Sequence, residues 1–172
     1  MEAFDSVHVE LIYLEDLSSQ QQISTVRALD VMIGVHGAGL TNIMYMRPKK
    51  SAVIEIFPFN VQRAPYDKLA SQLGVDYVHW RNTKAENTRF DFSLTNSSAS
   101  DREITLSMID KRQLTRDVIT TPNCGQFFNQ LDQGGICSRV LLKQDTIVDV
   151  NEFRVAFFRI YSRLTSTINP VA

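Results

Sequence analysis

The chain has 172 residues, a length that suits one domain with a single hydrophobic core. Its hydrophobic content of 44% and charged content of 22% are ordinary for a globular protein, and a net charge of −1 gives no bulk attraction for nucleic acid or for an anionic membrane surface. No apolar run approaches the length of a membrane span, and residues 1–5 do not begin a signal peptide. These features leave either a cytosolic protein or a targeting segment outside this chain.

The first half of the chain alternates between apolar runs and stretches with helical spacing. A short apolar run bounded by polar residues or turn residues is typical of a strand that is covered on both faces. Such runs predict strands at residues 7–14, 31–35, 52–57 and 75–80. Strands that alternate with helices through short links predict an α/β fold, a doubly wound parallel sheet with right-handed crossovers.

Helices are expected between these strands. The first begins at a capping box that starts at Ser18 or Ser19, and it ends before Asp30. The second begins at residue 38 or 40. The third begins near Pro65 and runs to about residue 73, where Gly74 suits the helix end.

The second half of the chain is less regular. Residues 82–135 are rich in polar residues and predict a loop-rich insertion, with a weak helical pattern over 101–117 and a glycosylation sequon at Asn96 that matters only in the secretory pathway. Cys124 and Cys137 either pair or remain free buried thiols. A further capping box, Asp149-x-x-Glu152, predicts a C-terminal helix over residues 149–168 with one apolar face.

The most informative stretch is Asp30–Asn42, where the strand at 31–35 runs into His36-Gly37-Ala38-Gly39-Leu40-Thr41. A strand followed by a glycine turn that opens a helix presents free backbone N–H groups and the positive end of the helix dipole to an anion. Glycines at this turn let the backbone bend sharply and let a phosphate approach closely. The stretch lacks the dinucleotide fingerprint and the P-loop lysine, so close packing of helix on strand is an equally good explanation of the turn alone.

Two side chains favour the anion site. His36 lies at the carboxyl end of its strand, where parallel α/β sheets bind ligands, and it adds a donor or a charge there. Glu55 interrupts an apolar strand, and a buried acid is costly unless it is paired or hydrogen-bonded. Glu55 either accepts bonds from the ribose hydroxyls of a nucleotide or forms an internal salt bridge with Arg27 or Arg63.

The other polar residues near the turn are weaker candidates. Thr41 either binds a phosphate or serves its own helix, and Asn42 is equally ambiguous. His8 and His79 are expected to be surface or packing residues. The histidines and cysteines are dispersed, and no spacing matches a zinc site.

Five segments carry a family resemblance: Asp30–Asn42, Ser51–Pro58, Tyr66–Ala70 with Gly74, Tyr77–Asn82 and Gln144–Val150. Together they resemble glycosyltransferase family 61, and the resemblance extends over about residues 7–164. It implies an enzyme of the GT-B type, with two Rossmann-like domains and an inverting transfer from a UDP-sugar, most simply UDP-N-acetylglucosamine, to a glycoprotein. The acceptor would be an O-mannosyl glycan or a Ser or Thr side chain.

The resemblance implies that residues 1–172 form the C-terminal, donor-binding domain. His36 and the backbone of Gly37, Ala38, Gly39, Leu40 and Thr41 would then stabilise the leaving diphosphate, with Glu55 at the nucleotide. Nothing in the sequence calls for a divalent metal. The catalytic base would lie in an N-terminal half-domain or at its interface, so we expect this chain alone to be inactive as an enzyme.

Members of the family work in the lumen of the endoplasmic reticulum or Golgi, often behind a membrane anchor that this chain does not contain. The sequon at Asn96 and a Cys124–Cys137 bridge are compatible with that compartment. The alternative function is a non-catalytic nucleotide-binding or interaction domain that has kept the fold.

Overall fold

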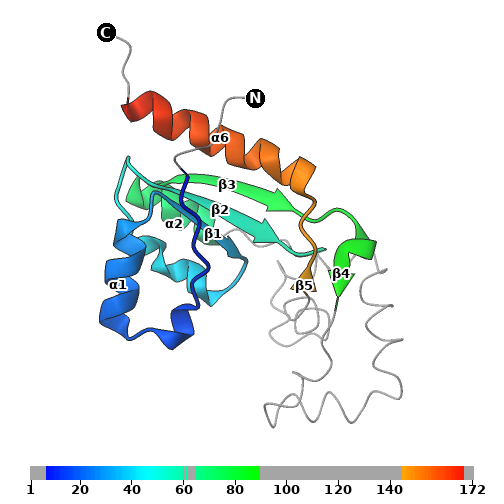
Figure 1. Cartoon of the computed structure of the whole chain (residues 1–172), viewed down its shortest axis with the longest axis horizontal. Helices are drawn as coiled ribbons and strands as arrows, with labels where there is room; N and C mark the ends of the chain where they lie inside the picture. Colours follow the sequence, from blue (N-terminus) through cyan, green and yellow to red (C-terminus); the bar gives the residue numbers. More distant parts are fainter. Residues whose placement is uncertain (1–6, 60, 62–64, 90–144, 169–172) are drawn as a thin grey trace.

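The computed structural model describes residues 7–59, 61, 65–89 and 145–168, and Figure 1 shows their arrangement. The elements, in chain order, are η1 (Leu14–Asp16), α1 (Ser19–Ala28), β1 (Val31–Val35), η2 (Ala38–Tyr45), β2 (Ala52–Phe57), α2 (Pro65–Leu73), β3 (Asp76–Arg81), η3 (Ala85–Asn87), β4 (Thr88–Arg89), β5 (Asp145–Thr146) and α6 (Val150–Ile168). The elements marked η are 3₁₀ helices. The expected helix at 101–117, the two cysteines and the sequon at Asn96 lie outside the described residues.

The centre of the fold is a parallel sheet of three strands in the order β1-β2-β3. All six residues of β2, the middle strand, are buried, as its continuous apolar run predicts. Gly34 of β1, Glu55 of β2 and His79 of β3 are in register, so these three positions share one face of the sheet. The α/β class and the parallel sheet are confirmed.

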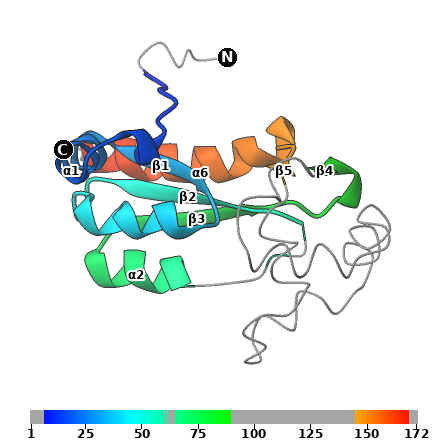
Figure 2. The same ribbon diagram turned by 90° about the horizontal axis from the view of Figure 1, so that it is seen from below.

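Each face of the sheet has its own hydrophobic cluster, and Figure 2 shows the sheet between two helical layers. One face packs against α1, η2 and α2 through a cluster that includes Val26, Leu40, Ile43, Val53 and Ala70. The other face packs against α6 through Ala52, Ile54, Ile56, Trp80, Ala156 and Ile160. The alternation predicted for the strand at 75–80 follows this division, because Tyr77 packs on the first side and Trp80 on the second.

Local signals placed the helix ends well. Ser18 caps α1 with a complete capping box, in which its side chain accepts from the Gln21 amide and the Gln21 side chain accepts from the Ser18 amide. Gly74 follows α2 with a φ of 67°, a left-handed conformation that favours glycine. Asp149 Oδ1 accepts from the amides of Asn151 and Glu152 and caps α6. The capping box at α6 is only half formed, because the Glu152 carboxylate binds Lys84 at 3.0 Å instead.

The strand predicted at residues 7–14 is wrong. Residues 7–13 form no helix or strand, and the chain then makes the 3₁₀ turn η1. Val9 is 81% exposed and Leu11 79% exposed, so no second layer covers these apolar side chains. An apolar run forms a strand only where a neighbouring strand completes the ladder. No ladder joins this segment to β1 in the described chain.

Candidate functional site

His36 lies directly after β1 and extends the sheet by one residue, because its amide donates to the carbonyl of Ile56 at 2.8 Å. The residue is 9% exposed, so its ring is largely enclosed at the carboxyl edge of the sheet. This is the edge where open α/β sheets bind ligands. The strand therefore delivers the imidazole to the place that the sequence predicts.

The ring of His36 binds the carboxylate of Glu55, with 2.5 Å between Nδ1 and Oε1. The second carboxylate oxygen, Oε2, accepts a hydrogen bond from the hydroxyl of Tyr77. Glu55 is 0% exposed, so these two bonds compensate its burial. The observed partners of Glu55 are His36 and Tyr77 rather than Arg27, and Arg63, the other partner expected from the sequence, lies outside the described residues.

This arrangement bears on the predicted ribose contact of Glu55. Both carboxylate oxygens are engaged by protein groups, and the side chain has no exposed surface. A direct bond to a ribose hydroxyl stays a prediction, and it would require His36 or Tyr77 to give way. In the observed arrangement the Glu55 carboxylate binds the His36 ring.

Aromatic rings enclose His36 on its other sides. Phe57 stacks on the imidazole with 5.2 Å between the ring centroids and an angle of 21°, and Tyr66 meets it edge-on at 5.6 Å. The Arg81 guanidinium also lies over the Phe57 ring, 4.6 Å from the ring centroid, and it donates to the carbonyl of Val61. The aromatic rings fix the plane of the imidazole, and Arg81 adds a positive charge beside them.

The turn after His36 opens the 3₁₀ helix η2, whose N-cap is Gly37. The Leu40 amide donates to the Gly37 carbonyl at 3.0 Å, so the amides of Ala38 and Gly39 have no acceptor within the helix itself. Both residues are exposed. The helix start predicted at residue 38 is confirmed, and its two leading amides are open to an approaching group.

The expected reason for the two glycines needs correction. Gly37 has an extended backbone with a φ of 171°, and Gly74 is the described glycine with a left-handed φ. A methyl group on Gly39 would meet Leu14 at an ordinary contact distance of 3.9 Å. The turn therefore does not need glycine for its backbone conformation. Close approach of a ligand remains as the predicted reason for a small residue at Gly39.

The hydroxyl of Thr41 donates to the Ala38 carbonyl at 2.7 Å, and the Asn42 amide donates to the Gly39 carbonyl at 3.0 Å. Both side chains therefore bond to backbone carbonyls of η2 itself in this structure. Binding of a phosphate by Thr41 stays a prediction that requires its hydroxyl to turn away from the helix. His8 and His79 are exposed, as the sequence predicts.

Burial raises the pKa of the Tyr77 phenol well above its ordinary value of 10.0, and the hydrogen bond to Glu55 and the charge of Glu55 raise it further. The nearby Asp67 carboxylate acts in the same direction, while Arg81 opposes them. Burial lowers the pKa of the Arg81 guanidinium. Tyr77 therefore keeps its proton in the folded protein and acts as the donor to Glu55.

This raised pKa predicts a loss of stability at alkaline pH. In the unfolded chain Tyr77 loses its proton near pH 10, whereas in the folded protein it keeps it to higher pH, so its contribution is complete below pH 10 and falls above that value. The slope from one such group is about 1.4 kcal/mol per pH unit. Urea unfolding of the wild type and of Tyr77→Phe between pH 9 and 11 measures it. Parallel pH profiles for the two proteins would contradict the role of Tyr77.

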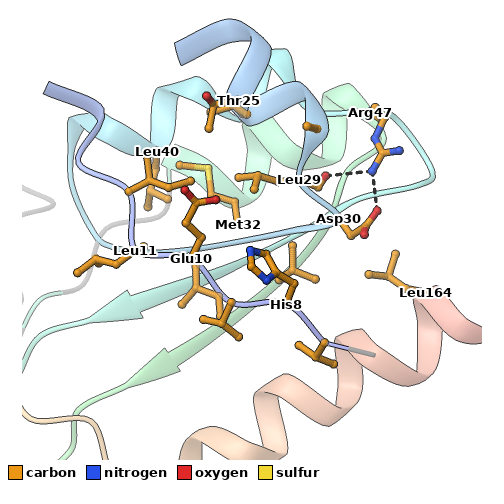
Figure 3. A pocket seen from close by; sticks show the side chains of 18 of the residues that line it. His8, Glu10, Leu11, Thr25, Leu29, Asp30, Met32, Leu40, Arg47 and Leu164 are labelled. Atoms are coloured by element: carbon orange, nitrogen blue, oxygen red, sulfur yellow. Dashed lines mark hydrogen bonds and ion pairs between the residues drawn. The ribbon is translucent and has the colours of Figure 1, made fainter. Parts of the chain in front are cut away.

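A groove of about 1240 Å³ lies elsewhere on the described part of the protein (Figure 3). Residues 7–12 cross over β1 and form one wall, and Phe157, Tyr161 and Leu164 of α6 form another. The groove shares Gly39 and Leu40 with the turn, but His36 and Glu55 are not among its lining residues. The groove is lined mainly by apolar side chains, and its hydrogen-bonded ion pair, Arg47 with Asp30 at 2.6 Å, lies among exposed residues. We place the candidate site at His36, because there the hydrogen-bonded groups are buried at the carboxyl edge of the sheet.

Within the described ranges, no group of three or more His, Cys, Asp or Glu side chains is arranged to hold a metal ion. None of the helices in the described part of the chain is both long and apolar enough to span a membrane.

The sequence did not identify Tyr77, Phe57 or Arg81 as site residues. The available signal was the alternation of β3, which places Tyr77, His79 and Arg81 on the same face as Glu55. A polar residue on the middle strand of a sheet needs partners on the adjacent strands, so the positions beside Glu55 were the ones to inspect.

Comparison with known proteins finds similarity to one family over part of the chain. The model described as glycosyltransferase 61 matches residues 1–54, which include β1, His36 and η2. The protein O-linked-mannose beta-1,4-N-acetylglucosaminyltransferase 2 of Danio rerio is 39% identical over 82 residues, which are 45% of this chain and 14% of that protein. The protein of the same name from Bos taurus is 34% identical over 82 residues, with the same two shares. The beta-1,2-xylosyltransferase of Arabidopsis thaliana is 33% identical over 84 residues, 48% of this chain and 16% of that protein.

These matches confirm the resemblance to glycosyltransferase family 61 over part of the chain. The matched part of the chain spans about one seventh of the length of these relatives.

Proposed function

Given the similarity to glycosyltransferase family 61, we propose that this chain forms the donor-binding part of a glycosyltransferase that uses a UDP-sugar and inverts the anomeric centre. The donor is UDP-N-acetylglucosamine and the acceptor is a glycoprotein, on an O-mannosyl glycan or on a Ser or Thr side chain. The observation that carries the proposal is the placement of His36 beside the open amides of Ala38 and Gly39 at the carboxyl edge of a parallel sheet.

The chemistry assigns this site to the leaving group. In an inverting transfer the acceptor hydroxyl attacks the anomeric carbon, a general base takes its proton, and the bond to the diphosphate breaks. Negative charge develops on the diphosphate oxygen, and donors that are already oriented toward it lower the barrier. In our proposal the two leading amides of η2 and the His36 ring supply these donors.

Glu55 binds His36, and Tyr77 binds Glu55, so neither is proposed to contact the donor. We assign no base among the described residues. The base belongs to a second, N-terminal Rossmann-like domain of the GT-B arrangement, and the donor is held where the two domains meet. The compartment proposed for the complete enzyme is the lumen of the endoplasmic reticulum or Golgi.

Binding of UDP should stabilise the folded chain. The expected gain is about 2.7 kcal/mol when free UDP is present at 100 times its dissociation constant. Thermal unfolding of the 172-residue chain with UDP, GDP or ADP, each with and without EDTA, measures the gain and the nucleotide preference. We expect UDP to stabilise most and EDTA to make no difference; no shift with any nucleotide would remove the basis for the site.

Gly39→Val tests the turn itself. The added side chain begins 3.9 Å from Leu14, so stability without ligand should change little, whereas the shift caused by UDP should disappear because the valine blocks the approach to the Ala38 and Gly39 amides. Met44→Val, an exposed position near the other end of the same helix, is the matched control and should keep the full shift. Full UDP binding by Gly39→Val would show that the turn is only structural.

A further inference from the structure

Three side chains from three consecutive strands form one hydrogen-bonded row behind the turn. Tyr77 on β3 donates to Glu55 on β2, and Glu55 binds Nδ1 of His36 at the end of β1. The row ends at Nε2 of His36, which has no hydrogen-bond partner within the part of the chain that the structure describes. The row therefore ends at a ring nitrogen without a hydrogen bond in the described chain. This nitrogen is the one that would bind the ligand in our proposal.

Proton counting gives the row a direction. Tyr77 keeps its phenol proton and is the donor to Oε2; if the Glu55 carboxylate is ionised, it accepts at both oxygens and Nδ1 of His36 carries the proton between them. For Nε2 to donate to a diphosphate as well, the ring must carry both protons. The positive charge of that ring, in a residue only 9% exposed, needs a buried counter-charge.

Glu55 is the counter-charge in contact with the ring. Around the row, Arg81 acts electrostatically on both Glu55 and Tyr77, Asp67 acts on Tyr77, and the ring of His79 lies 6.3 Å from that of Tyr77. The rings of Phe57 and Tyr66 hold the plane of His36, so the bond from Nδ1 fixes the remaining rotation. Orientation and protonation of the imidazole are thus both set from the Glu55 side.

We propose that Glu55 and Tyr77 are positioning residues: Glu55 accepts from Nδ1 and balances the charge of a His36 ring that carries both protons, so that its Nε2–H donates to the leaving diphosphate. This inference rests on the proposed function for its ligand but not for its geometry. Neither residue touches the substrate. Tyr77 orients the side chain at position 55. Because its hydroxyl donates, the atom that faces it must be an acceptor.

The variant Glu55→Gln makes the proposal testable without a ligand. Tyr77 donates, so the amide oxygen of the glutamine should face Tyr77 and its NH₂ should face His36. The NH₂ group is a donor, so Nδ1 must become an acceptor and the ring proton must move to Nε2. In the double variant Glu55→Gln with Tyr77→Phe the amide is free to rotate, and the proton should return in part to Nδ1.

Long-range ¹H–¹⁵N correlation spectra of the ¹⁵N-labelled 172-residue chain report which ring nitrogen carries the proton. The chain has three histidines, and the signals of His36 are identified by their loss in His36→Gln. We expect Nδ1–H in the wild type, in Tyr77→Phe and in the control Tyr45→Phe, and Nε2–H in Glu55→Gln. The same His36 pattern in the wild type and in Glu55→Gln would overturn the proposal.

UDP affinity then measures what the positioning does for binding. Glu55→Gln should weaken UDP binding by about 10- to 100-fold, the range for loss of a charge-assisted hydrogen bond. Tyr77→Phe should weaken it less, and Tyr45→Phe should leave it unchanged. If the wild type binds no UDP, the proposed function fails while the spectra still decide the positioning; if UDP binds equally well to Glu55→Gln and to the wild type, the positioning role is wrong and the donor site stands.

Discussion

Replacing Glu55 by leucine is expected to lower the free energy of unfolding by about 3 kcal/mol. The carboxylate is 0% exposed and is the partner of both His36 Nδ1 and the Tyr77 hydroxyl, so its removal leaves two enclosed polar groups without a bond. Each such group costs about 1–3 kcal/mol. Urea unfolding at neutral pH, followed by circular dichroism, measures the loss.

Two further variants separate the lost bonds from lost packing. The same substitution at Glu86, an exposed residue of η3, should change stability by no more than about 0.5 kcal/mol. The pair Glu55→Leu with His36→Phe removes both partners of the 2.5 Å bond, and it should lose less than the sum of the two single changes. Wild-type stability in Glu55→Leu would contradict the role of the row as a structural element of the sheet.

The sequence predicted the fold where local signals and layer packing agree. The capping box of Ser18, the glycine after α2 and the buried run of β2 each specify one structure, and each appears as expected. The segment at 7–14 also has an apolar run, but within the described chain no neighbouring strand completes a ladder with it, and its strand is not formed. Whether a neighbour is available is a property of the whole sheet, which a local pattern does not contain.

The candidate site was predictable only in part, because one of its contacts also depends on how neighbouring strands align. His36 and Glu55 stand out because each is a polar residue in an apolar strand context, and the structure brings them into contact. Tyr77 has no such signal in the sequence, because a tyrosine is a common residue in any strand. Only the register between β2 and β3 shows that its hydroxyl reaches Glu55, and register depends on the crossover through α2.

Truncation of Ile160 to alanine is expected to cost about 2–5 kcal/mol in the free energy of unfolding. Ile160 is 0% exposed and lies in the cluster that joins α6 to the second face of the sheet, together with Ile54 and Trp80. α6 lies over this face of the sheet in Figure 1, so a cavity here weakens the contact between the sheet and this helix. Urea unfolding again measures the loss.

Val155→Ala on the same helix is the matched control. Val155 is 56% exposed, so its truncation leaves no cavity, and the better helix propensity of alanine should keep stability within about 0.5 kcal/mol of the wild type. Because α6 and His36 lie on opposite sides of the sheet, Ile160→Ala should also leave the His36 ring spectra unchanged under conditions where the variant is folded. Equal losses in the two variants would show that α6 is not anchored through Ile160, and a changed His36 spectrum in Ile160→Ala would show that the two faces of the sheet are coupled.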